Sequence, residues 1–305
     1  MNEKLTVELG GVPETLLWPL HCRAGEARRP GTALPDPRAV ATVDAVAYPF
    51  EQRFGRPHAS LALRAACFDE QVRHFLRDHP DGTVVALGEG LETQFWRVDN
   101  GRVRWLSVDL PEAVEVRRKL LPDEDRLRTL PCSALDERWM DEVDPDRGVM
   151  VVAQGLLMYF TEQESLRLVA SCARRFPGGR FLFDGMPKWL VGDQRNRGSQ
   201  EQDRGQNQER SRNQERGNRL STLLMRGRSK DEYQLPPFQW GAGVDELREK
   251  LLALDPRIAE VRDVRFPKGR GFVFGLAYPL LGGLRPVRNH RPTNTLVEFG
   301  KTPPD

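Results

Sequence analysis

Residues 84–112, "VVALGEGLETQFWRVDNGRVRWLSVDLPE", decide the fold class. They contain an apolar strand pattern, a turn with Gly88 and Gly90, and a second strand pattern that ends at Asp109. A dinucleotide-binding fingerprint has a third glycine where this chain has Thr93. The stretch therefore predicts the first unit of an open α/β sheet, without the full set of glycines that suits a pyrophosphate.

Short β-rich runs alternate with helical or turn-rich stretches along the rest of the chain. The runs are "TVVALG", "VRWLSVD", "LRTLPC", "GVMVVAQG" and "GRFLFDG", followed later by "IAEVRDVRFP" and "NTLVEFG". This alternation predicts a parallel sheet with helices on both faces. Before it, residues 58–76 place apolar side chains at helical spacing. In residues 269–283, "GRGFVFGLAYPLLGG", periodicity does not separate helix from strand.

The composition is that of a soluble globular protein. The 305 residues are 39% hydrophobic with a net charge of +2, so the basic excess of a dedicated nucleic-acid binder is missing. The four cysteines, Cys22, Cys67, Cys132 and Cys172, have no paired spacing, which predicts neither disulfides nor a metal site. With no secretory pattern and no apolar run of membrane-spanning length, we expect a cytoplasmic protein without a membrane or nucleic-acid partner.

The position of Asp109 suggests what the glycine loop binds. An acid at the end of the second strand, about 20 residues beyond such a loop, can accept hydrogen bonds from ribose hydroxyls. A ribose without a pyrophosphate fits S-adenosylmethionine, whose methionine part the glycines allow close to the backbone. Two alternatives stay open: the glycines only reverse the chain, or Asp109 only caps the helix expected in "LPEAVEVRRKLL".

Four motifs together resemble the leucine carboxyl methyltransferase family, and within it the bacterial branch of polyketide O-methyltransferases. They are "ALGEGLETQFWRV", "SVDLPEAVEVRRKLLP", "PCSALDERWMDEV" and "VVAQGLLMYFTEQE", in that order. The resemblance extends from "GVPETLLWPLHCRAGEARRP" through "LPPFQWG" to "LVEFG". It implies a class I methyltransferase fold, Rossmann-like, with an open sheet of seven strands, the last one antiparallel, a helical N-terminal cap and an insertion after the fifth strand.

The resemblance also implies how the chain is organised. We expect one methyltransferase domain over residues 1–305, in which residues 1–80 form the helical cap, 81–187 the cofactor-binding core, 188–240 a cap insertion and 241–305 the C-terminal part of the sheet. Within the insertion, residues 192–219 contain no apolar side chain and are predicted to be a disordered polar tract. The alternative, an RNA-binding or acid-binding tract, lacks interleaved aromatic residues.

Site residues follow from the matched motifs. The cofactor-binding candidates are Arg64, Gly88, Glu89, Gly90, Asp109, Leu110, Ser133, Ala134, Leu135 and Gln154. The resemblance assigns the cofactor's carboxylate to Arg64, although a surface arginine beside an apolar stripe has the same pattern. It assigns the adenine to 133–135, where Asp136 alternatively only caps a helix. Gln154 stands where many relatives carry Glu, which removes a negative charge and keeps an acceptor.

The acceptor side is less defined by sequence. Met158 and Tyr159 follow Gln154 and are expected to face the methyl group, or else to belong to the core. The other substrate-binding candidates are Trp18, Trp240 and Arg270, with Trp189 in the same cap. Tyr159 and Gln154 are the candidate catalytic residues, since none of the five histidines lies in a catalytic motif. A carboxylate acceptor would need no general base, whereas a phenol would benefit from one.

These features predict an S-adenosylmethionine-dependent O-methyltransferase that acts on a carboxyl or phenolic oxygen of a small, polyketide-like secondary metabolite. The alternative within the class is a protein C-terminal carboxyl methyltransferase. The alternatives from other classes are an NAD-dependent oxidoreductase, which Thr93 disfavours, and a non-catalytic, nucleic-acid-binding relative. The sequence leaves the oligomeric state and the identity of the acceptor open.

Overall fold

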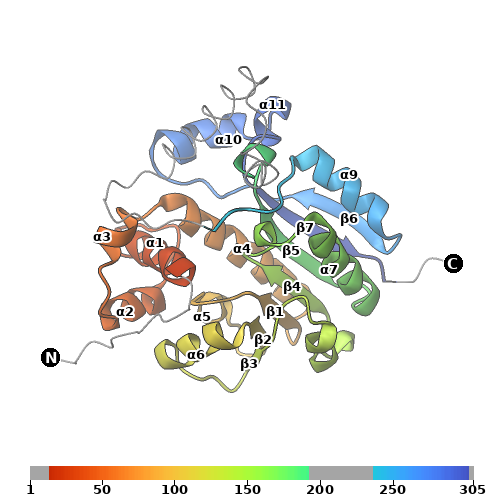
Figure 1. The fold of residues 1–305 in the computed structure, drawn as a ribbon, viewed down its shortest axis with the longest axis horizontal. Helices are drawn as coiled ribbons and strands as arrows, with labels where there is room; N and C mark the ends of the chain where they lie inside the picture. Colours follow the sequence, from red (N-terminus) through yellow and green to blue (C-terminus); the bar gives the residue numbers. More distant parts are fainter. Residues whose placement is uncertain (1–13, 192–235, 302–305) are drawn as a thin grey trace, which may run out of the picture.

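A sheet of seven strands forms the centre of the molecule, in the order β3-β2-β1-β4-β5-β7-β6 (Figure 1). The structure is a computed structural model, and it describes residues 14–191 and 236–301. The predicted polar tract, residues 192–219, lies outside the described residues. The strands are β1 Thr83–Leu87, β2 Arg104–Asp109, β3 Leu127–Pro131, β4 Val149–Ala153, β5 Arg180–Gly185, β6 Ile258–Asp263 and β7 Thr293–Phe299.

The strand directions confirm the predicted fold class. β1 to β5 pair in parallel, and β7 runs antiparallel to both of its neighbours, β5 and β6. The order reverses between β1 and β4, so that the connections leaving these two strands diverge to opposite sides. In an open α/β sheet this is the topological switch point, and the carboxyl ends of the two strands there border a crevice for ligands.

Helices occur between the strands and before the first one. The longer ones are α1 Leu17–Ala27, α2 Pro37–Ala45, α4 Ala59–Asp78, α6 Pro111–Leu120, α7 Glu162–Arg175 and α9 Val244–Leu254. The shorter ones are η1 Glu14–Leu16, α3 Phe50–Phe54, α5 Gln94–Val98, η2 Glu137–Glu142, η3 Pro145–Arg147, η4 Leu157–Tyr159 and η5 Lys188–Leu190. The stretch that periodicity left ambiguous is helical, with η7 Val273–Ala277, α10 Tyr278–Leu281 and, just beyond it, α11 Arg285–Arg288.

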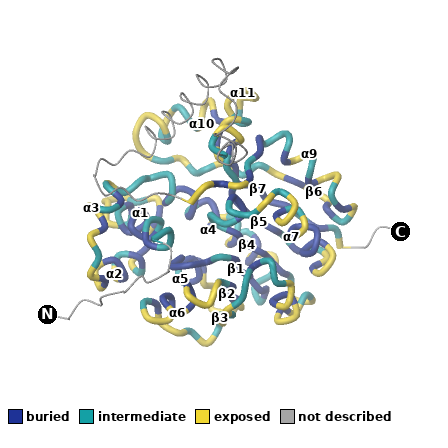
Figure 2. The backbone as a smooth tube through the Cα atoms, viewed as in Figure 1, coloured by how far each residue is buried: buried dark blue, intermediate teal, exposed yellow. Residues whose placement is uncertain are grey.

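Alternate residues of the strands pack on opposite faces of the sheet. Val84 and Ala86 of β1 lie on the face of the sheet that α4 and α5 cover, where they pack with the buried side chains of Phe68, Val72 and Phe75. Val85 and Leu87 belong to the other face, which α7 and α9 cover. Figure 2 shows the resulting buried interior along the strands. This two-sided burial explains why the strands read as continuous apolar runs in the sequence.

The N-terminal helices form a small core of their own beside the sheet. Leu17 and Leu20 of α1 pack with Phe50 and Phe54 of α3 and with Leu91, which follows the glycine loop. Figure 1 places α1, α2 and α3 together on one side of the sheet. Because Leu91 belongs to this core, the N-terminal helices are attached directly to the loop that leaves β1.

Candidate functional site

The glycine loop leaves β1 at the switch point and has no space for side chains at its two glycines. Gly88 and Gly90 have φ angles of 59° and 53°, in the left-handed region that glycine adopts without strain. A Cβ atom at Gly88 would lie 2.7 Å from the Leu156 side chain, and one at Gly90 would lie 2.5 Å from Leu16. The loop is therefore held between the segment after β4 and the N-terminal helices.

Asp109 lies at the end of β2 and binds the glycine loop. Its Oδ2 accepts a hydrogen bond from the Gly90 N–H at 2.6 Å, and its Oδ1 accepts one from the Leu110 N–H at 2.8 Å. Leu110, not Asp109, is the N-cap of α6, so the predicted alternative of a helix-capping role is wrong. Burial raises the pKa of Asp109, while the bond from Gly90 opposes that shift. Each carboxylate oxygen retains acceptor capacity beyond these single bonds.

Arg64 of α4 lies at the carboxyl ends of β4 and β5. It is only 8% exposed, so the alternative of a surface arginine is wrong. Its Nη1 donates to Asp184 Oδ2 at 2.9 Å, and Asp184 Oδ1 accepts a bond from the Gly155 N–H at 2.5 Å. The Nε atom of Arg64 is buried and has no hydrogen-bond partner. A buried guanidinium with an unused donor is costly in isolation and suits an anionic ligand.

Gln154 follows β4 directly and is oriented by one strong contact. Its Nε2 donates to Glu92 Oε2 at 2.8 Å, whereas its Oε1 is buried and has no partner. Because Glu92 binds the amide nitrogen of Gln154, the amide oxygen is left free to accept a hydrogen bond from another group. Next to it in the chain, Gly155 lies against Arg64, because a Cβ atom there would be 3.1 Å from Arg64 Nη1.

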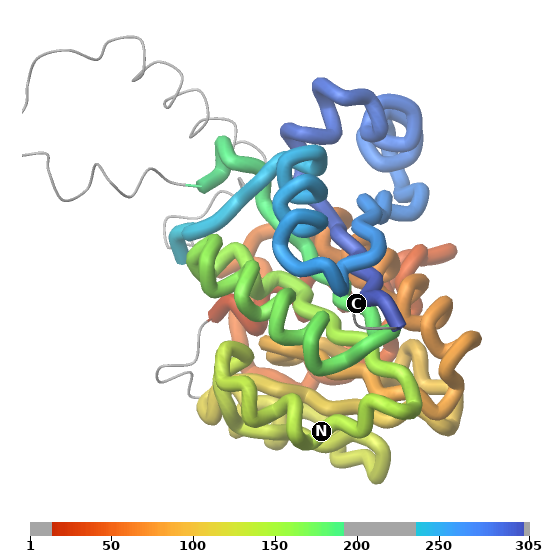
Figure 3. Tube along the Cα trace, turned by 90° about the vertical axis from the view of Figure 1, so that its right-hand side faces the viewer, coloured from red at the N-terminus to blue at the C-terminus, as the bar shows by residue number. Residues whose placement is uncertain are grey.

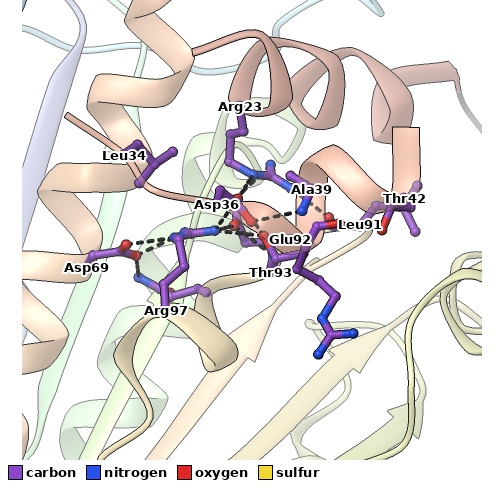
Figure 4. Close-up of polar contacts among 12 residues, drawn as sticks. Arg23, Leu34, Asp36, Ala39, Thr42, Asp69, Leu91, Glu92, Thr93 and Arg97 are labelled. Carbon is purple, nitrogen blue, oxygen red and sulfur yellow. Dashed lines mark hydrogen bonds and ion pairs between the residues drawn. The ribbon is translucent and has the colours of Figure 1, made fainter. Parts of the chain in front are cut away.

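Glu92 belongs to a buried ionic network beneath the glycine loop, drawn in Figure 4. The network consists of the guanidinium groups of Arg23 and Arg97 and the carboxylates of Asp36, Asp69 and Glu92. Their ion pairs measure 3.3 Å for Arg23–Asp36, 2.9 Å for Arg23–Glu92, 2.8 Å for Arg97–Asp36, 2.7 Å for Arg97–Asp69 and 2.8 Å for Arg97–Glu92.

The network joins four parts of the fold. Arg23 lies on α1, Asp36 precedes α2, Asp69 lies on α4, and Glu92 and Arg97 follow β1. The Thr93 hydroxyl donates to Asp36 Oδ2 at 2.7 Å, so the residue that replaces the third glycine has a structural contact of its own. Burial alone would raise the pKa of Glu92, but Arg23 and Arg97 outweigh it and lower the pKa to about 2. Glu92 is therefore a permanent anion behind Gln154.

Tyr159 and Met158 lie in η4, after Gln154. Burial raises the pKa of the Tyr159 phenol to about 12, against a smaller opposing effect of Arg64. Its ring lies 5.7 Å from that of Phe238. Met158 is 2% exposed, and its carbonyl oxygen accepts a bond from the Gln239 N–H at 2.8 Å. Tyr159 thus lies close enough to Arg64 to interact with it electrostatically, while Met158 is part of the packed interior.

The remaining cofactor candidates lie at neighbouring strand ends. Ser133, Ala134 and Leu135 follow β3, where the Ala134 carbonyl accepts a bond from Trp139 Nε1 at 3.0 Å. Asp136 caps η2 through Arg138 N, as the alternative for this stretch predicted. Leu110 is 52% exposed.

Glu89 differs from the other loop candidates because its carboxylate is turned into the protein. It accepts a bond from Trp105 Nε1 at 3.1 Å and pairs with Arg117 Nη2 at 3.2 Å. Arg117 also donates to the carbonyl oxygens of Gly90 and Glu92, at 2.7 and 2.8 Å. The pair Glu89–Arg117 therefore supports the backbone of the loop from below.

The acceptor-side candidates are spread over a larger region. Trp240 is buried and stacks on Phe183 at 6.4 Å, with its indole Nε1 unpartnered. Trp18 is half-buried, and its ring lies 6.4 Å from that of His58. Arg270 is exposed and donates to the Pro30 carbonyl, and Trp189 donates to the His290 carbonyl at 2.9 Å. Of these residues, Trp240 lies beside η4, because its backbone N–H donates to the Met158 carbonyl at 3.3 Å.

Other kinds of site are not evident in residues 14–191 and 236–301. Within these ranges, no group of three His, Cys, Asp or Glu side chains is arranged to hold a metal ion. No helix there is long and apolar enough to cross a membrane. A cavity of about 660 Å³ borders the ionic network. Asp36, Asp69 and Arg97 line it together with Arg38, Arg73 and Trp96, among others, whereas neither Asp109 nor Gln154 borders it.

Sequence reasoning missed Asp184 and Glu92, which hold Arg64 and Gln154 respectively. Asp184 could have been noticed, because it is the acid that ends the apolar run "FLFDG" of the fifth strand. Glu92 gives no such signal, since its partners Arg23 and Arg97 come from two separate helices. Its role follows only from the packing of the N-terminal helices on the loop.

Comparisons with known proteins identify the family of the chain. The family model described as "Leucine carboxyl methyltransferase" matches residues 23–173. The tetracenomycin polyketide synthesis O-methyltransferase TcmP of Streptomyces glaucescens is 34% identical over 61% of this chain and 70% of its own length. The S-adenosyl-L-methionine-dependent methyltransferase dpfgK of Gibberella zeae is 28% identical over 57% of this chain and 64% of its own length.

Among solved structures, an O-methyltransferase family protein from Burkholderia thailandensis aligns with a TM-score of 0.37 and 16% identity. The alignment covers 88% of this chain and 68% of that chain. The chain matches about two thirds of the length of its curated relatives. By family model and relatives, the chain belongs to the leucine carboxyl methyltransferase family. It is a methyltransferase, and its cofactor is S-adenosylmethionine.

Proposed function

We propose that the chain is an O-methyltransferase that methylates a carboxyl or phenolic oxygen of a small, polyketide-like secondary metabolite. The observation that carries the proposal is a pair of buried, unpartnered polar atoms, Arg64 Nε and Gln154 Oε1, on adjoining segments at the switch point. The acceptor class is supported by the Streptomyces relative, a tetracenomycin polyketide synthesis O-methyltransferase.

The residues at the strand ends fit S-adenosylmethionine by their donor and acceptor types. The guanidinium of Arg64, held at Nη1 by Asp184, offers its remaining donors to the cofactor's carboxylate. The carboxylate of Asp109 retains acceptor positions for two ribose hydroxyls. Gly88 and Gly90 allow the backbone close to the methionine part, and residues 133–135 lie at the neighbouring strand end for the adenine.

The cationic part of the cofactor is matched by an acceptor that carries no charge of its own. Gln154 offers its unpartnered Oε1, and the anionic Glu92 lies directly behind the same amide at 2.8 Å. Many relatives carry a glutamate at this position after the fourth strand. In this chain the negative charge lies one side chain further back, on Glu92. In a buried site of low dielectric, an anion that lies one side chain further away still stabilises a cation.

Catalysis in this site rests on positioning. S-adenosylmethionine supplies a methyl group on a positively charged sulfonium, which an oxygen nucleophile attacks in line. The chain's residues need to orient the acceptor oxygen and exclude water. With a pKa raised to about 12, Tyr159 keeps its proton at neutral pH and donates a hydrogen bond to the acceptor. It does not serve as a general base there.

The ionisation of the acceptor oxygen decides between the two substrate classes. A carboxylate, with an ordinary pKa near 4, is ionised at neutral pH, whereas a phenol, near 10, is not. Among the described residues, no histidine contact involves Arg64, Gln154 or Tyr159. With no histidine next to these residues to deprotonate a phenol, a carboxylate is the favoured acceptor.

A labelling experiment tests this function. The purified protein is incubated with methyl-labelled S-adenosylmethionine and a panel of flat aromatic carboxylic acids and matched phenols. We expect label in an organic-soluble product that mild base releases, as it does for a methyl ester, and that Asp109→Ala abolishes. Base-stable label would indicate a phenol ether instead. Label transferred only to protein termini, or to no acceptor in a panel covering both classes, would contradict the proposal.

A further inference from the structure

The connection between β6 and β7 is longer than the topology requires. The two strands are antiparallel neighbours, and a turn of two to five residues can join such a pair. Here residues 264–292 intervene, and Figure 3 shows them as helical coils at the top of the molecule, beyond the sheet. We call this segment the arm. Long connections inside a compact domain usually have a function of their own.

The inner side of the arm is packed against the rest of the protein. Phe266, Phe274 and Tyr278 form an aromatic group with ring centroids 5.5 to 6.4 Å apart. A Cβ atom at Gly269 would lie 2.6 Å from Leu63 of α4, and the Cys67 thiol contacts the Arg265 carbonyl at 3.6 Å. The start of the arm is therefore fixed against α4, and the aromatic group joins the helical part of the arm to that start.

The outer side of the arm is apolar and exposed. Its large hydrophobic side chains and their exposed fractions are Phe272 74%, Val273 59%, Leu276 52%, Leu280 68%, Leu281 49%, Leu284 52% and Val287 38%. Single exposed hydrophobic residues are ordinary, but a contiguous group on one element marks an interaction surface. A helix that is apolar all round is expected to be covered on all sides.

The arm carries an excess of positive charge, which favours a negatively charged partner. Residues 264–292 contain no Asp or Glu. Arg288 and Arg291 pair with Asp245 and Asp263 outside the arm. The other basic residues of the arm are Arg265, Lys268, Arg270 and Arg285, and none of them forms an ion pair within the part of the chain that the structure describes.

From these observations we propose that the outer face of the arm docks on an anionic lipid surface. Exposed apolar side chains flanked by uncompensated Lys and Arg are the two features that bind a helix into the interface of an anionic bilayer. A second copy of the chain fits less well, because an isologous contact would bring the unpaired cations of the two arms together. The inference stands on the arm alone and is independent of the cofactor site.

Vesicle co-sedimentation of the full chain tests the proposal. The probes are vesicles of phosphatidylcholine alone and of phosphatidylcholine mixed with phosphatidylglycerol. We expect binding to the mixed vesicles that weakens with added salt. Leu276→Ser/Leu280→Ser is expected to lower the partition coefficient at least tenfold, and Lys268→Ala about fivefold. Leu252→Ser is the matched control, since Leu252 is 39% exposed on α9, outside the arm, and should leave binding unchanged.

Three results would overturn the proposal. The first is a wild-type protein that stays in solution with both kinds of vesicle. This result overturns the proposal also if the protein binds a soluble acidic polypeptide instead. The second is a wild-type dimer, detected by analytical ultracentrifugation, that the double serine variant dissociates, because a second copy then covers the arm. The third is a double serine variant that melts well below the wild type, combined with a wild type that binds no vesicles. In that case the apolar side chains stabilise the folded chain itself, because another segment of the same chain covers the outer face.

Discussion

The network beneath the glycine loop and the arm between β6 and β7 reverse the usual distribution of side chains. In the network, the buried charged groups of Arg23, Asp36, Asp69, Glu92 and Arg97 all have partners of opposite sign. On the arm, by contrast, large apolar side chains are up to 74% exposed to solvent. Buried charges without partners are too costly to persist, so the network is complete within the chain. Exposed apolar groups cost less, and they indicate a contact beyond it.

The largest effect is expected on removing the centre of the network. Arg97→Ala leaves Asp36, Asp69 and Glu92 without the guanidinium that all three share, at distances of 2.7 to 2.8 Å. We expect a loss of about 3–5 kcal/mol in the free energy of unfolding, measured with urea. Arg126→Ala, which breaks the more exposed pair with Asp99, should cost no more than about 1 kcal/mol. Equal losses for the two variants would mean that burial does not distinguish the network.

A second, smaller effect separates the support of Gln154 from general stability. Glu92→Gln removes the anion that fixes the Gln154 amide, and the affinity for S-adenosylmethionine should fall about tenfold, or about 1.4 kcal/mol. Asp69→Asn is the control from the same network, because Asp69 has no contact with Gln154. It should lower stability and leave the affinity unchanged. If both variants weaken binding alike, Glu92 does not position Gln154.

Tyr159→Phe probes the site next to Gln154. The loss of one hydrogen-bond donor should lower turnover about fivefold, equivalent to roughly 1 kcal/mol, with little change in the KM for S-adenosylmethionine. Because burial raises the pKa of Tyr159 to about 12, the phenol does not titrate between pH 6 and pH 9. The pH profile of turnover in that range should therefore be the same in the variant and the wild type. A basic limb that disappears in Tyr159→Phe would show that the phenol acts as a base.

The smallest effect is expected on the arm. Leu280→Ala, at a side chain 68% exposed, should change the free energy of unfolding by no more than about 0.5 kcal/mol. Leu251→Ala, at a fully buried leucine of α9, should cost about 2–5 kcal/mol in the same urea titration. A loss at Leu280 that approaches the one at Leu251 would mean that the arm is covered within the folded chain.

Much of the fold could be predicted from the sequence, because most of its strands are buried on both faces and read as separate apolar runs. The seven predicted runs correspond to the seven strands. The stretch 269–283 could not be assigned, since a helix that is apolar on its inner and outer sides has no helical period to detect. Which side of this helical segment is exposed to solvent depends on the tertiary packing alone.

The site could be predicted less completely. Gly88, Gly90 and Asp109 are close in sequence, and the structure brings them into contact through one hydrogen bond. Arg64 needed the family resemblance, because nothing in its own helix distinguishes it from a surface residue. Glu92 and Asp184 act through side chains that are distant in sequence, Arg23 and Arg64 among them, and local patterns do not report such pairs.

The central claim is that Asp109 and the glycine loop form the ribose-binding part of an S-adenosylmethionine site. Calorimetric titration of the purified protein with S-adenosylmethionine and, separately, with NAD tests it most directly, repeated with Asp109→Ala and with the surface control Asp81→Ala. We predict saturable binding of S-adenosylmethionine only, weakened at least tenfold, about 1.4 kcal/mol, by Asp109→Ala and unchanged by Asp81→Ala. Binding of NAD alone, or S-adenosylmethionine affinity that survives the loss of Asp109, would contradict the account.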